Sequence, residues 1–333
     1  MIAIITIMCI ICKGESIKNR KHLRICRDVN TIPMLPDTLL FLDCDECDKI
    51  QFLPTLPESL ERLECRGCTQ LQTLPDLPKT LKVLFCLRNY NLVLIPKLPH
   101  SLELFSCCDC YNLKTLPDLS PILIKFNCSS CPNLTYIPKL PQSLISLWCE
   151  GCSNLSFIPE LPQSLETLYC GACLTLSEIP KLPDSLIRIQ CFDCKKIISL
   201  PKLPKNLCVL WCFRCPLLET LPTLPLTLQR LFCFECPNLV TIPELPPSII
   251  EFWCNGCTGL IFIPENAHKH ISLMMLETIH NNYLKWKKEQ TLCWFSSKTG
   301  IVYEELIKRT WHPSRVVDWC WDTEEVKWFK SLR

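Results

Sequence analysis

The segment Ser59 to Pro78 reads SLERLECRGCTQLQTLPDLP, and it decides the fold because most of the chain repeats it. Its first cysteine recurs every 21 residues from Cys44 to Cys254, in eleven units without an insertion or a deletion. A second cysteine follows three positions later in ten of these units, and Asn89 stands in its place in the other. A fixed period of this length predicts a solenoid of stacked, equivalent turns.

Within one unit, the alternation of side chains predicts a short strand with one buried side. Leu63 and Cys65 lie two residues apart, so both point to one side of the strand, and Glu64 points to the other. Pro75 and Pro78 suit an extended return segment, because such a segment needs no ladder hydrogen bonds. Units stacked about 4.8 Å apart would bury a continuous apolar core. The repeat therefore predicts a parallel strand ladder.

The pattern LxxLxCxxC resembles the leucine-rich-repeat consensus LxxLxLxxN, with cysteines in place of an inward leucine and of the ladder asparagine. Asn89 occupies that asparagine position. The LPxLPxSL half is similar to repeats of bacterial effectors secreted into host cells, and the cysteine-rich 21-residue form resembles repeat proteins of large amoeba-infecting DNA viruses. The resemblance covers about two thirds of the chain. It implies an α/β-type repeat solenoid: a leucine-rich-repeat horseshoe with a parallel strand ladder, an extended Pro-rich convex side and a small helical C-terminal cap.

Residues 1–36 are expected to form degenerate N-terminal repeats that cap the array of residues 37–265. The first of these units fits the spacing with Ile4, Ile7, Cys9 and Cys12. A second covers Leu23, Ile25, Val29 and Ile32. The alternative interpretation of the first residues as a signal peptide lacks a basic n-region and a small-residue cleavage site.

Residues 266–333 are expected to form a helical C-terminal cap and tail. Apolar residues recur at helical spacing at Ile271, Met275, Ile279, Tyr283 and Trp286. This spacing predicts an amphipathic helix over 266–289 that covers the exposed end of the core. The tryptophan-rich remainder is expected to hold two further short helices, with Pro313 in the first turn of one and Thr323 at the start of the other.

Composition narrows the classes of partner. The net charge of +2, from 35 basic and 33 acidic residues, gives no support for a nucleic-acid or membrane partner. The 28 prolines would suit a disordered chain, but a hydrophobic content of 48% argues against disorder. We expect a monomer without a cofactor.

The 28 cysteines allow three interpretations. Cys44, Cys47, Cys65 and Cys68 have the spacing C-x2-C-x17-C-x2-C, which zinc sites also use. Neighbouring strands are also close enough for disulfides. However, the cysteines fall where the repeat needs small buried side chains, and Asn89 would interrupt a metal ladder. We expect buried free thiols, no metal and a reducing cytoplasm, that of the host if the protein is viral.

Catalysis has one candidate, the sequence Cys320-Trp321-Asp322. The bacterial effectors that the repeats resemble carry a ubiquitin-ligase domain with a CxD nucleophile, which would make Cys320 the nucleophile and Asp322 its activator. That catalytic domain is several times longer than the tail available here, so no enzymatic activity is expected. A substrate-recognition module linked to ubiquitination remains the alternative function.

The outward side of the strands is the candidate binding surface, because repeat proteins of the resembled family bind partners there. Aromatic residues gather at these positions in the C-terminal half, and such residues are enriched in protein interfaces. Alternatively, they reflect only the preference of aromatic residues for strands, or the tail covers them. The chain is predicted to be an interaction scaffold for a host or viral protein, with partner-binding residues Trp148, Tyr169, Phe192, Trp211, Phe213, Phe232, Phe234 and Trp253.

Overall fold

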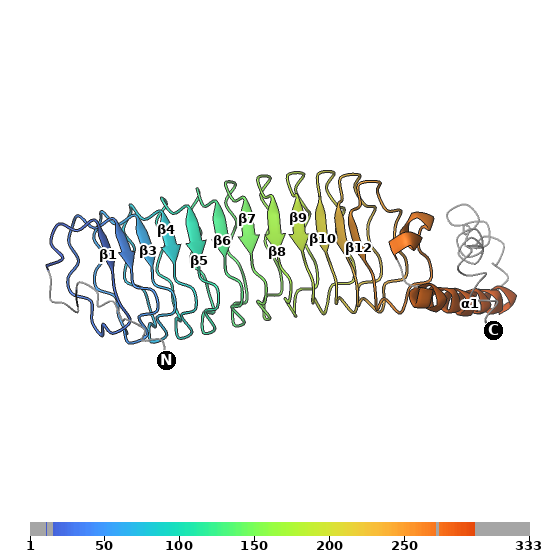
Figure 1. Ribbon diagram of the computed structural model, residues 1–333, viewed down its shortest axis with the longest axis horizontal. Helices are drawn as coiled ribbons and strands as arrows, with labels where there is room; N and C mark the ends of the chain where they lie inside the picture. The colour runs from blue at the N-terminus through green and yellow to red at the C-terminus, as the bar shows by residue number, and fades with distance from the viewer. Residues whose placement is uncertain (1–10, 12–15, 271–272, 297–333) are drawn as a thin grey trace, which may run out of the picture. The chain divides into compact units, whose positions relative to one another are not determined.

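The computed structural model describes residue 11, residues 16–270 and residues 273–296. Twelve parallel strands of three residues each form one sheet, in which the order of the strands follows the chain (Figure 1). The strands are β1 His22–Arg24, β2 Phe41–Asp43, β3 Arg62–Glu64, β4 Val83–Phe85, β5 Leu104–Ser106, β6 Lys125–Asn127, β7 Ser146–Trp148, β8 Thr167–Tyr169, β9 Arg188–Gln190, β10 Val209–Trp211, β11 Arg230–Phe232 and β12 Glu251–Trp253.

The chain divides into two compact units, Met1–Cys191 and Phe192–Arg333. In the first unit, each strand from β2 onward pairs with the next at an offset of 21 residues, as in the Leu63–Leu84 pair. β1 pairs with β2 at a shorter offset, with Leu23 beside Leu42. In the second unit, β10, β11 and β12 pair at the same 21-residue offset.

The two sides of each strand differ in burial as the alternation predicts. In β3, Leu63 is 0% exposed, as are the following Cys65 and the second cysteine, Cys68. The same three positions are buried from repeat to repeat, so leucines and thiols form the interior of the solenoid. Glu64, on the other side, is 6% exposed because two arginines cover it. The predicted assignment of the two sides is confirmed.

The second cysteine replaces the ladder asparagine in function as well as in position. Its thiol donates a hydrogen bond to the carbonyl of the first cysteine in the preceding repeat, for example from Cys68 Sγ to Cys44 O at 3.0 Å. The same bond recurs at Cys110, Cys131, Cys152, Cys173, Cys236 and Cys257. At Asn89 the amide Nδ2 makes the equivalent bond, to Cys65 O at 2.8 Å. The predicted substitution of cysteine for asparagine is therefore confirmed.

The residue before each second cysteine adopts a left-handed backbone, which the sequence did not reveal. The φ angle is 57° at Asp109 and 54° at Ala172, and only three of the eleven equivalent residues are glycine. A non-glycine residue in this region costs about 1–2 kcal/mol. The conformation lets the backbone N–H of Asp109 bond to Ser129 O, at 2.9 Å, so the ladder continues beyond the strand.

On the return side, a hydroxyl ladder joins the repeats. The Ser101 hydroxyl lies 2.7 Å from both Lys79 O and Leu81 O, and these two carbonyls share its single proton. Equivalent bonds are made by Ser59, Thr80, Ser143, Ser164, Ser185, Thr227 and Ser248. These bonds pair carbonyls of the Pro-rich segment, where proline supplies no N–H of its own.

The C-terminal cap consists of a 3-10 helix, η1 (Glu265–His270), followed by α1 (Leu273–Ser296). A helix was predicted over 266–289, and a helix is present in this region, but its bounds differ. The chain first forms the tight turn of η1 after Pro264, so the α-helix begins later than predicted. Met275, Ile279 and Tyr283 of α1 are buried, as their spacing predicts. In the described part of the chain, no helix combines the length and the apolar character that a bilayer crossing needs.

Several predicted features lie outside the residues that the structure describes. They are the first degenerate unit with Ile4, Ile7, Cys9 and Cys12, and the candidate catalytic residues Cys320 and Asp322. The two further helices expected around Pro313 and Thr323 lie outside them as well.

Candidate functional site

Two columns of side chains form the strand face of the repeats. The strand column holds the third residue of each strand, and the turn column holds the residue two positions further along. The left-handed turn follows directly and fixes where the turn column lies. All eight predicted binding residues lie in these columns, and all are half-buried except Trp253, which is 55% exposed.

In the second unit, the two columns are aromatic, and neighbouring rings within each column are in contact. In the turn column, the rings of Phe192, Phe213 and Phe234 are separated by 4.8 and 4.4 Å and are nearly parallel, with interplanar angles of 5° and 7°. In the strand column, Trp211 lies 5.3 Å from Phe232, which lies 5.8 Å from Trp253. A contact of 6.5 Å between Trp211 and Phe213 joins the columns. Six aromatic rings therefore form one continuous surface.

The two tryptophans of this surface differ in exposure. Trp211 lies between rings of both columns, and its indole Nε1 is buried without a hydrogen-bond partner among the described residues. Trp253 ends the strand column, and more than half of its side chain is exposed. A buried indole N–H without a partner is unfavourable, so the placement of Trp211 lowers the stability of the fold.

Ion pairs border the aromatic columns on both sides. On the strand side, Arg230 Nε lies 3.5 Å from Glu251 Oε1. On the turn side, Arg214 Nε lies 2.8 Å from Glu235 Oε2, and its Nη1 lies 4.0 Å from Asp193 Oδ2. These charges neutralise one another within the protein. The surface is therefore an apolar strip with a polar margin, which is the usual composition of a protein interface.

In the described strands of the first unit, the strand column holds aromatic residues at Phe85, Trp148 and Tyr169, and of these only Trp148 and Tyr169 are neighbours. Trp148 and Tyr169 lie 5.9 Å apart with their rings tilted at 45°. Glu150, in the turn column, lacks a salt-bridge partner among the described residues, and burial raises the pKa of its carboxyl group.

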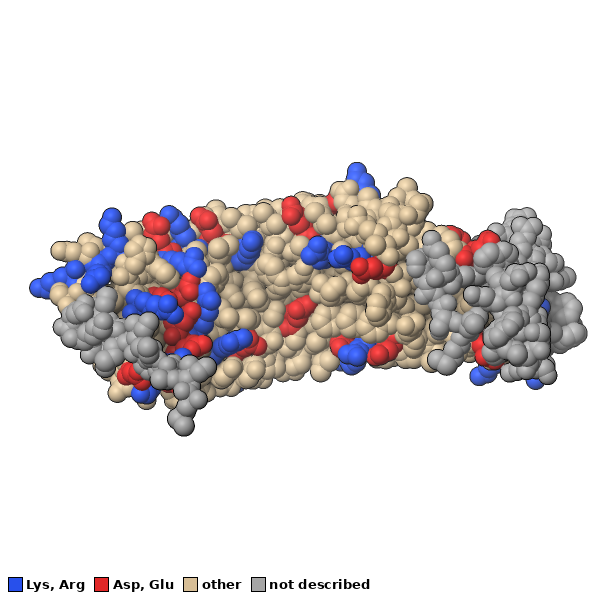
Figure 2. All heavy atoms as spheres, viewed as in Figure 1, with Lys and Arg blue, Asp and Glu red and all other residues tan. Residues whose placement is uncertain are grey.

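The N-terminal repeats of the first unit instead carry a charged network, which sequence reasoning missed. Glu64 is paired with Arg62 and with Arg66, whose Nη2 lies 2.8 Å from Glu64 Oε2. Both guanidinium groups also lie over the ring of Phe85, at 5.5 and 5.0 Å. The signal was present in the spacing, since Arg62, Glu64 and Arg66 occupy every second position of one repeat and therefore share its outward side. Figure 2 shows charged side chains gathered over the first repeats on the side in view.

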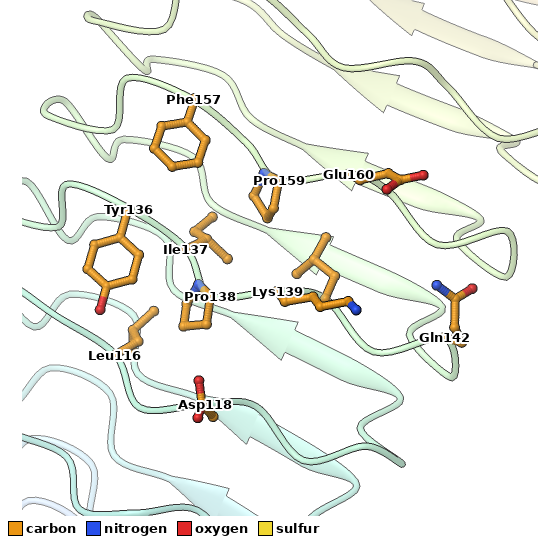
Figure 3. A pocket seen from close by; sticks show the side chains of 11 residues that line it. Leu116, Asp118, Tyr136, Ile137, Pro138, Lys139, Gln142, Phe157, Pro159 and Glu160 are labelled. Carbon is orange, nitrogen blue, oxygen red and sulfur yellow. The ribbon is translucent and has the colours of Figure 1, made fainter.

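A groove of about 500 Å³ lies on the return side of the first unit, away from the predicted residues. Figure 3 shows the rings of Tyr136 and Phe157 beside Pro138 and Pro159, which line it. The sequence had identified the repeated prolines as scaffold only. The exposed aromatic residues at this position of the repeat were a signal that the sequence offered and that was overlooked.

The interior thiols are arranged for packing. Among the described residues, no group of three or more histidine, cysteine or acidic side chains is placed to hold a metal ion. Cys65, Cys86 and Cys212 are completely buried, and burial raises the pKa of each of these thiols well above its usual value. A hydrogen bond with a neighbouring thiol instead lowers the pKa of Cys152 and of Cys236. A thiol that stays protonated is a poor metal ligand and a poor nucleophile.

Solved structures share this architecture. YopM from Yersinia enterocolitica WA-314 is 27% identical and superimposes with a TM-score of 0.51, over 71% of this chain and 53% of that chain. The leucine-rich effector protein YopM from Yersinia pestis is 26% identical, with a TM-score of 0.47, over 74% of this chain and 85% of that chain. For a leucine-rich repeat protein from Bacteroides ovatus ATCC 8483, the values are 16% and 0.41, over 72% and 76%.

The chain spans about half the length of the Yersinia enterocolitica YopM chain that it matches. No protein-family model matches the chain, and no curated protein does. The 21-residue units, the parallel strand ladder and the likeness to YopM agree with one another. The chain is a leucine-rich-repeat solenoid.

Proposed function

We propose that the protein is a non-enzymatic interaction scaffold, and that the aromatic columns of residues 192–253 bind a partner protein. The observation that carries this proposal is the continuous surface of six aromatic rings in contact, from Phe192 to Trp253, on the strand face. A contiguous apolar patch of this kind is costly to expose to water unless a partner covers it.

The margin of the surface supports a protein partner. The neighbouring charges, such as Arg214 and Arg230, are already paired with carboxylates of the same unit. A polyanion such as DNA would need unpaired cations, whereas an apolar protein surface would not. Trp211 and Trp253 belong to the residue type most enriched among energetic hot spots.

The first unit would contribute Trp148 and Tyr169 to the same partner or to a second one. The resemblance of the repeats to those of secreted effectors and of amoeba-infecting viruses supports a host or viral protein as the partner. Buried cysteines that form no disulfide, such as Cys44, Cys65 and Cys86, support a reducing compartment such as the host cytoplasm.

The test is capture of partners from host-cell lysate by the full chain and by the variant Trp211→Ala/Trp253→Ala. If these residues anchor the partner, each truncation should cost about 2 kcal/mol or more of binding free energy, so capture should be lost. Circular dichroism on the same samples must show that the variant is folded. The control is Phe52→Ala/Phe157→Ala, which removes two exposed rings from the return side. Undiminished capture by the folded tryptophan variant would contradict the proposal.

A further inference from the structure

A hollow of about 370 Å³ lies on the strand face of the first unit. It arises from the sizes of four consecutive residues in the strand column, which are large, small, small and large: Phe85, Ser106, Asn127 and Trp148. With strands about 4.8 Å apart, Phe85 and Trp148 are separated by roughly 14 Å. The two rings therefore form end walls, and Ser106 and Asn127 form the floor between them.

The strands beneath the hollow compensate for the small outward residues with large inward ones. Phe105 and Phe126, the middle residues of β5 and β6, are 1% and 0% exposed, and their rings stack at 5.3 Å. Most other repeats have leucine there. The stacked rings of Phe105 and Phe126 fill the interior beneath Ser106 and Asn127, so the hollow keeps its shape without a ligand.

The lining of the hollow is cationic. It includes Arg66 and Lys125 and contains no carboxylate. Arg66 is already paired, with Glu64 at 2.8 Å and with Asp45 at 3.5 Å. Lys125 is exposed, and no carboxylate of the described residues forms a salt bridge with it. The cationic group left for a ligand is therefore the ammonium of Lys125.

We propose that this hollow binds an acidic segment of a partner protein, with one large apolar side chain between Phe85 and Trp148 and a carboxylate at Lys125. The proposal rests on the proposed function only in that a protein binds the strand face. The apolar side chain is required because the walls are aromatic and Leu87 and Leu104 lie at the margins. The carboxylate is required because it would neutralise the one cation of the lining that lacks a partner.

The floor adds a directional element. Asn127 Oδ1 accepts a hydrogen bond from the backbone N–H of Ser129 at 2.9 Å, which fixes the orientation of the amide. Its Nδ2 group is then the side that remains for a ligand carbonyl. An extended peptide carries such carbonyls at every residue, so the floor suits a peptide backbone.

A nucleic acid is the competing polyanionic ligand, and the lining argues against it. Affinity for a phosphate backbone comes from several cations that each neutralise a phosphate. Here Arg66 is engaged by Glu64 and Asp45, so Lys125 alone would contribute. A nucleic acid is therefore included in the test as an outcome that would overturn the proposal.

The experiment uses the full chain and two fluorescein-labelled peptides, Gly-Asp-Glu-Phe-Asp-Glu-Gly and Gly-Lys-Lys-Phe-Lys-Lys-Gly, measured by fluorescence anisotropy. The acidic peptide should bind at least about tenfold more tightly than the basic one. Lys125→Glu should weaken it by about tenfold or more, as expected for reversing a charge close to a carboxylate. Ser106→Phe should abolish binding, because it extends the Phe85 wall into the hollow.

Two matched controls carry the same chemical changes elsewhere in the first unit. Lys139→Glu reverses a charge on the return side, and Gln190→Phe adds a ring to the strand column four repeats beyond Ser106. Both should leave the affinity for the acidic peptide within about twofold, since neither residue lines the hollow. Equal affinity for the two peptides, no effect of Lys125→Glu, or tighter binding of an oligothymidylate would overturn the proposal.

The variant Trp211→Ala/Trp253→Ala separates this site from the aromatic columns. It should bind the acidic peptide as the unsubstituted protein does while it loses its captured partner. If the peptide fails to bind but the tryptophan variant still loses its partner, the hollow is not a site and the proposed function stands. If the peptide binds and the tryptophan variant keeps its partner, the aromatic columns are wrong and the hollow is supported.

Discussion

The interior and the strand face of this solenoid vary along the chain in different ways. Inside, most repeats present leucine and two cysteines, other apolar residues such as Phe105 replace the leucine in a few, and Asn89, at a second-cysteine position, makes the same hydrogen bond as the thiols. Outside, the strand column changes from Glu64 to Ser106 to Trp148. An inward side chain must fill a closed space against its own equivalents in the neighbouring repeats, whereas an outward one touches its neighbours on one side and keeps another side open to solvent or a partner. The variable positions are therefore those that can carry function.

Among the predicted changes, alkaline pH should lower the unfolding free energy most, because it acts on the buried thiols of the interior. Burial raises the pKa of Cys254 to about 12 from an ordinary value near 9. The folded state thus favours the neutral thiol, and this contribution is complete below pH 9 and is lost as the pH rises toward 12. Each such thiol removes about 1.4 kcal/mol per pH unit in this window. Circular dichroism should show steep unfolding between pH 9 and 12.

The far-ultraviolet absorbance of thiolate gives the corresponding check on mechanism. Most of it should rise together with unfolding, because burial raises the pKa of thiols such as Cys86 and Cys212. A smaller part should rise earlier, from Cys152 and Cys236, whose pKa a hydrogen bond with a neighbouring thiol lowers, and from partly exposed cysteines such as Cys208. Thiolate absorbance that reaches its full value near pH 9 while the circular dichroism stays native would mean that the interior is open to solvent.

Leu210→Ala should have the next largest effect. Leu210 is the middle residue of β10 and is 0% exposed, so its truncation leaves a cavity and should cost about 2–5 kcal/mol of unfolding free energy. Urea unfolding monitored by circular dichroism measures this cost. A loss below about 1 kcal/mol would show that the repeats close the cavity by moving together.

Substitutions of Asn89 should change the unfolding free energy by an intermediate amount, and they test the hydrogen bonds made at the second-cysteine position. Asn89→Ala removes the donor to Cys65 O, so a buried carbonyl loses its partner at a cost of about 1–3 kcal/mol. Asn89→Cys should cost less, because it restores the thiol of the other repeats and removes the amide oxygen, which is buried without a partner. Equal destabilisation of the two variants in urea unfolding would contradict a hydrogen-bonding role for the thiols.

Trp253→Ala should have the smallest effect on stability. Its side chain is 55% exposed and touches one ring, Phe232, at the end of the strand column. Substitutions at such positions usually change the unfolding free energy by about 0.5 kcal/mol or less. A loss comparable to that of Leu210→Ala in the same urea experiment would mean that the strand face and the interior are not separable.

Sequence reasoning succeeded wherever a regular period determines the structure. The alternation of Leu63, Glu64 and Cys65 predicted the buried and outward sides, and Asn89 identified the ladder position. It failed at the turn before the second cysteine, where hydrogen bonds of the backbone, rather than the type of side chain, determine the conformation. Glu46 and Ala172 give no sign of a left-handed conformation, since their neighbours impose it through the ladder.

The strand face was predictable in position but not in detail. The aromatic residues could be assigned to one side because each lies next to a first cysteine. The hollow could not be predicted, because it depends on the sizes of Ser106 and Asn127 relative to residues 21 and 42 positions away. The ends of α1 were also predicted wrongly. The spacing of apolar residues shows which face of a helix is buried, but it does not show at which residues the helix begins and ends.

The end of the array shows how such a chain can change its length. Asn282 of α1 donates to Thr258 O and Leu260 O, at 2.6 and 3.0 Å. Within the array, the hydroxyl of Thr175 makes the equivalent pair of bonds, to Ser153 O and Leu155 O. The helix thus presents to the last repeat the donor that another repeat would present. Duplication of any 21 residues would then add a turn whose junctions already fit, and its new outward residues could diverge toward a different partner while the cap is kept.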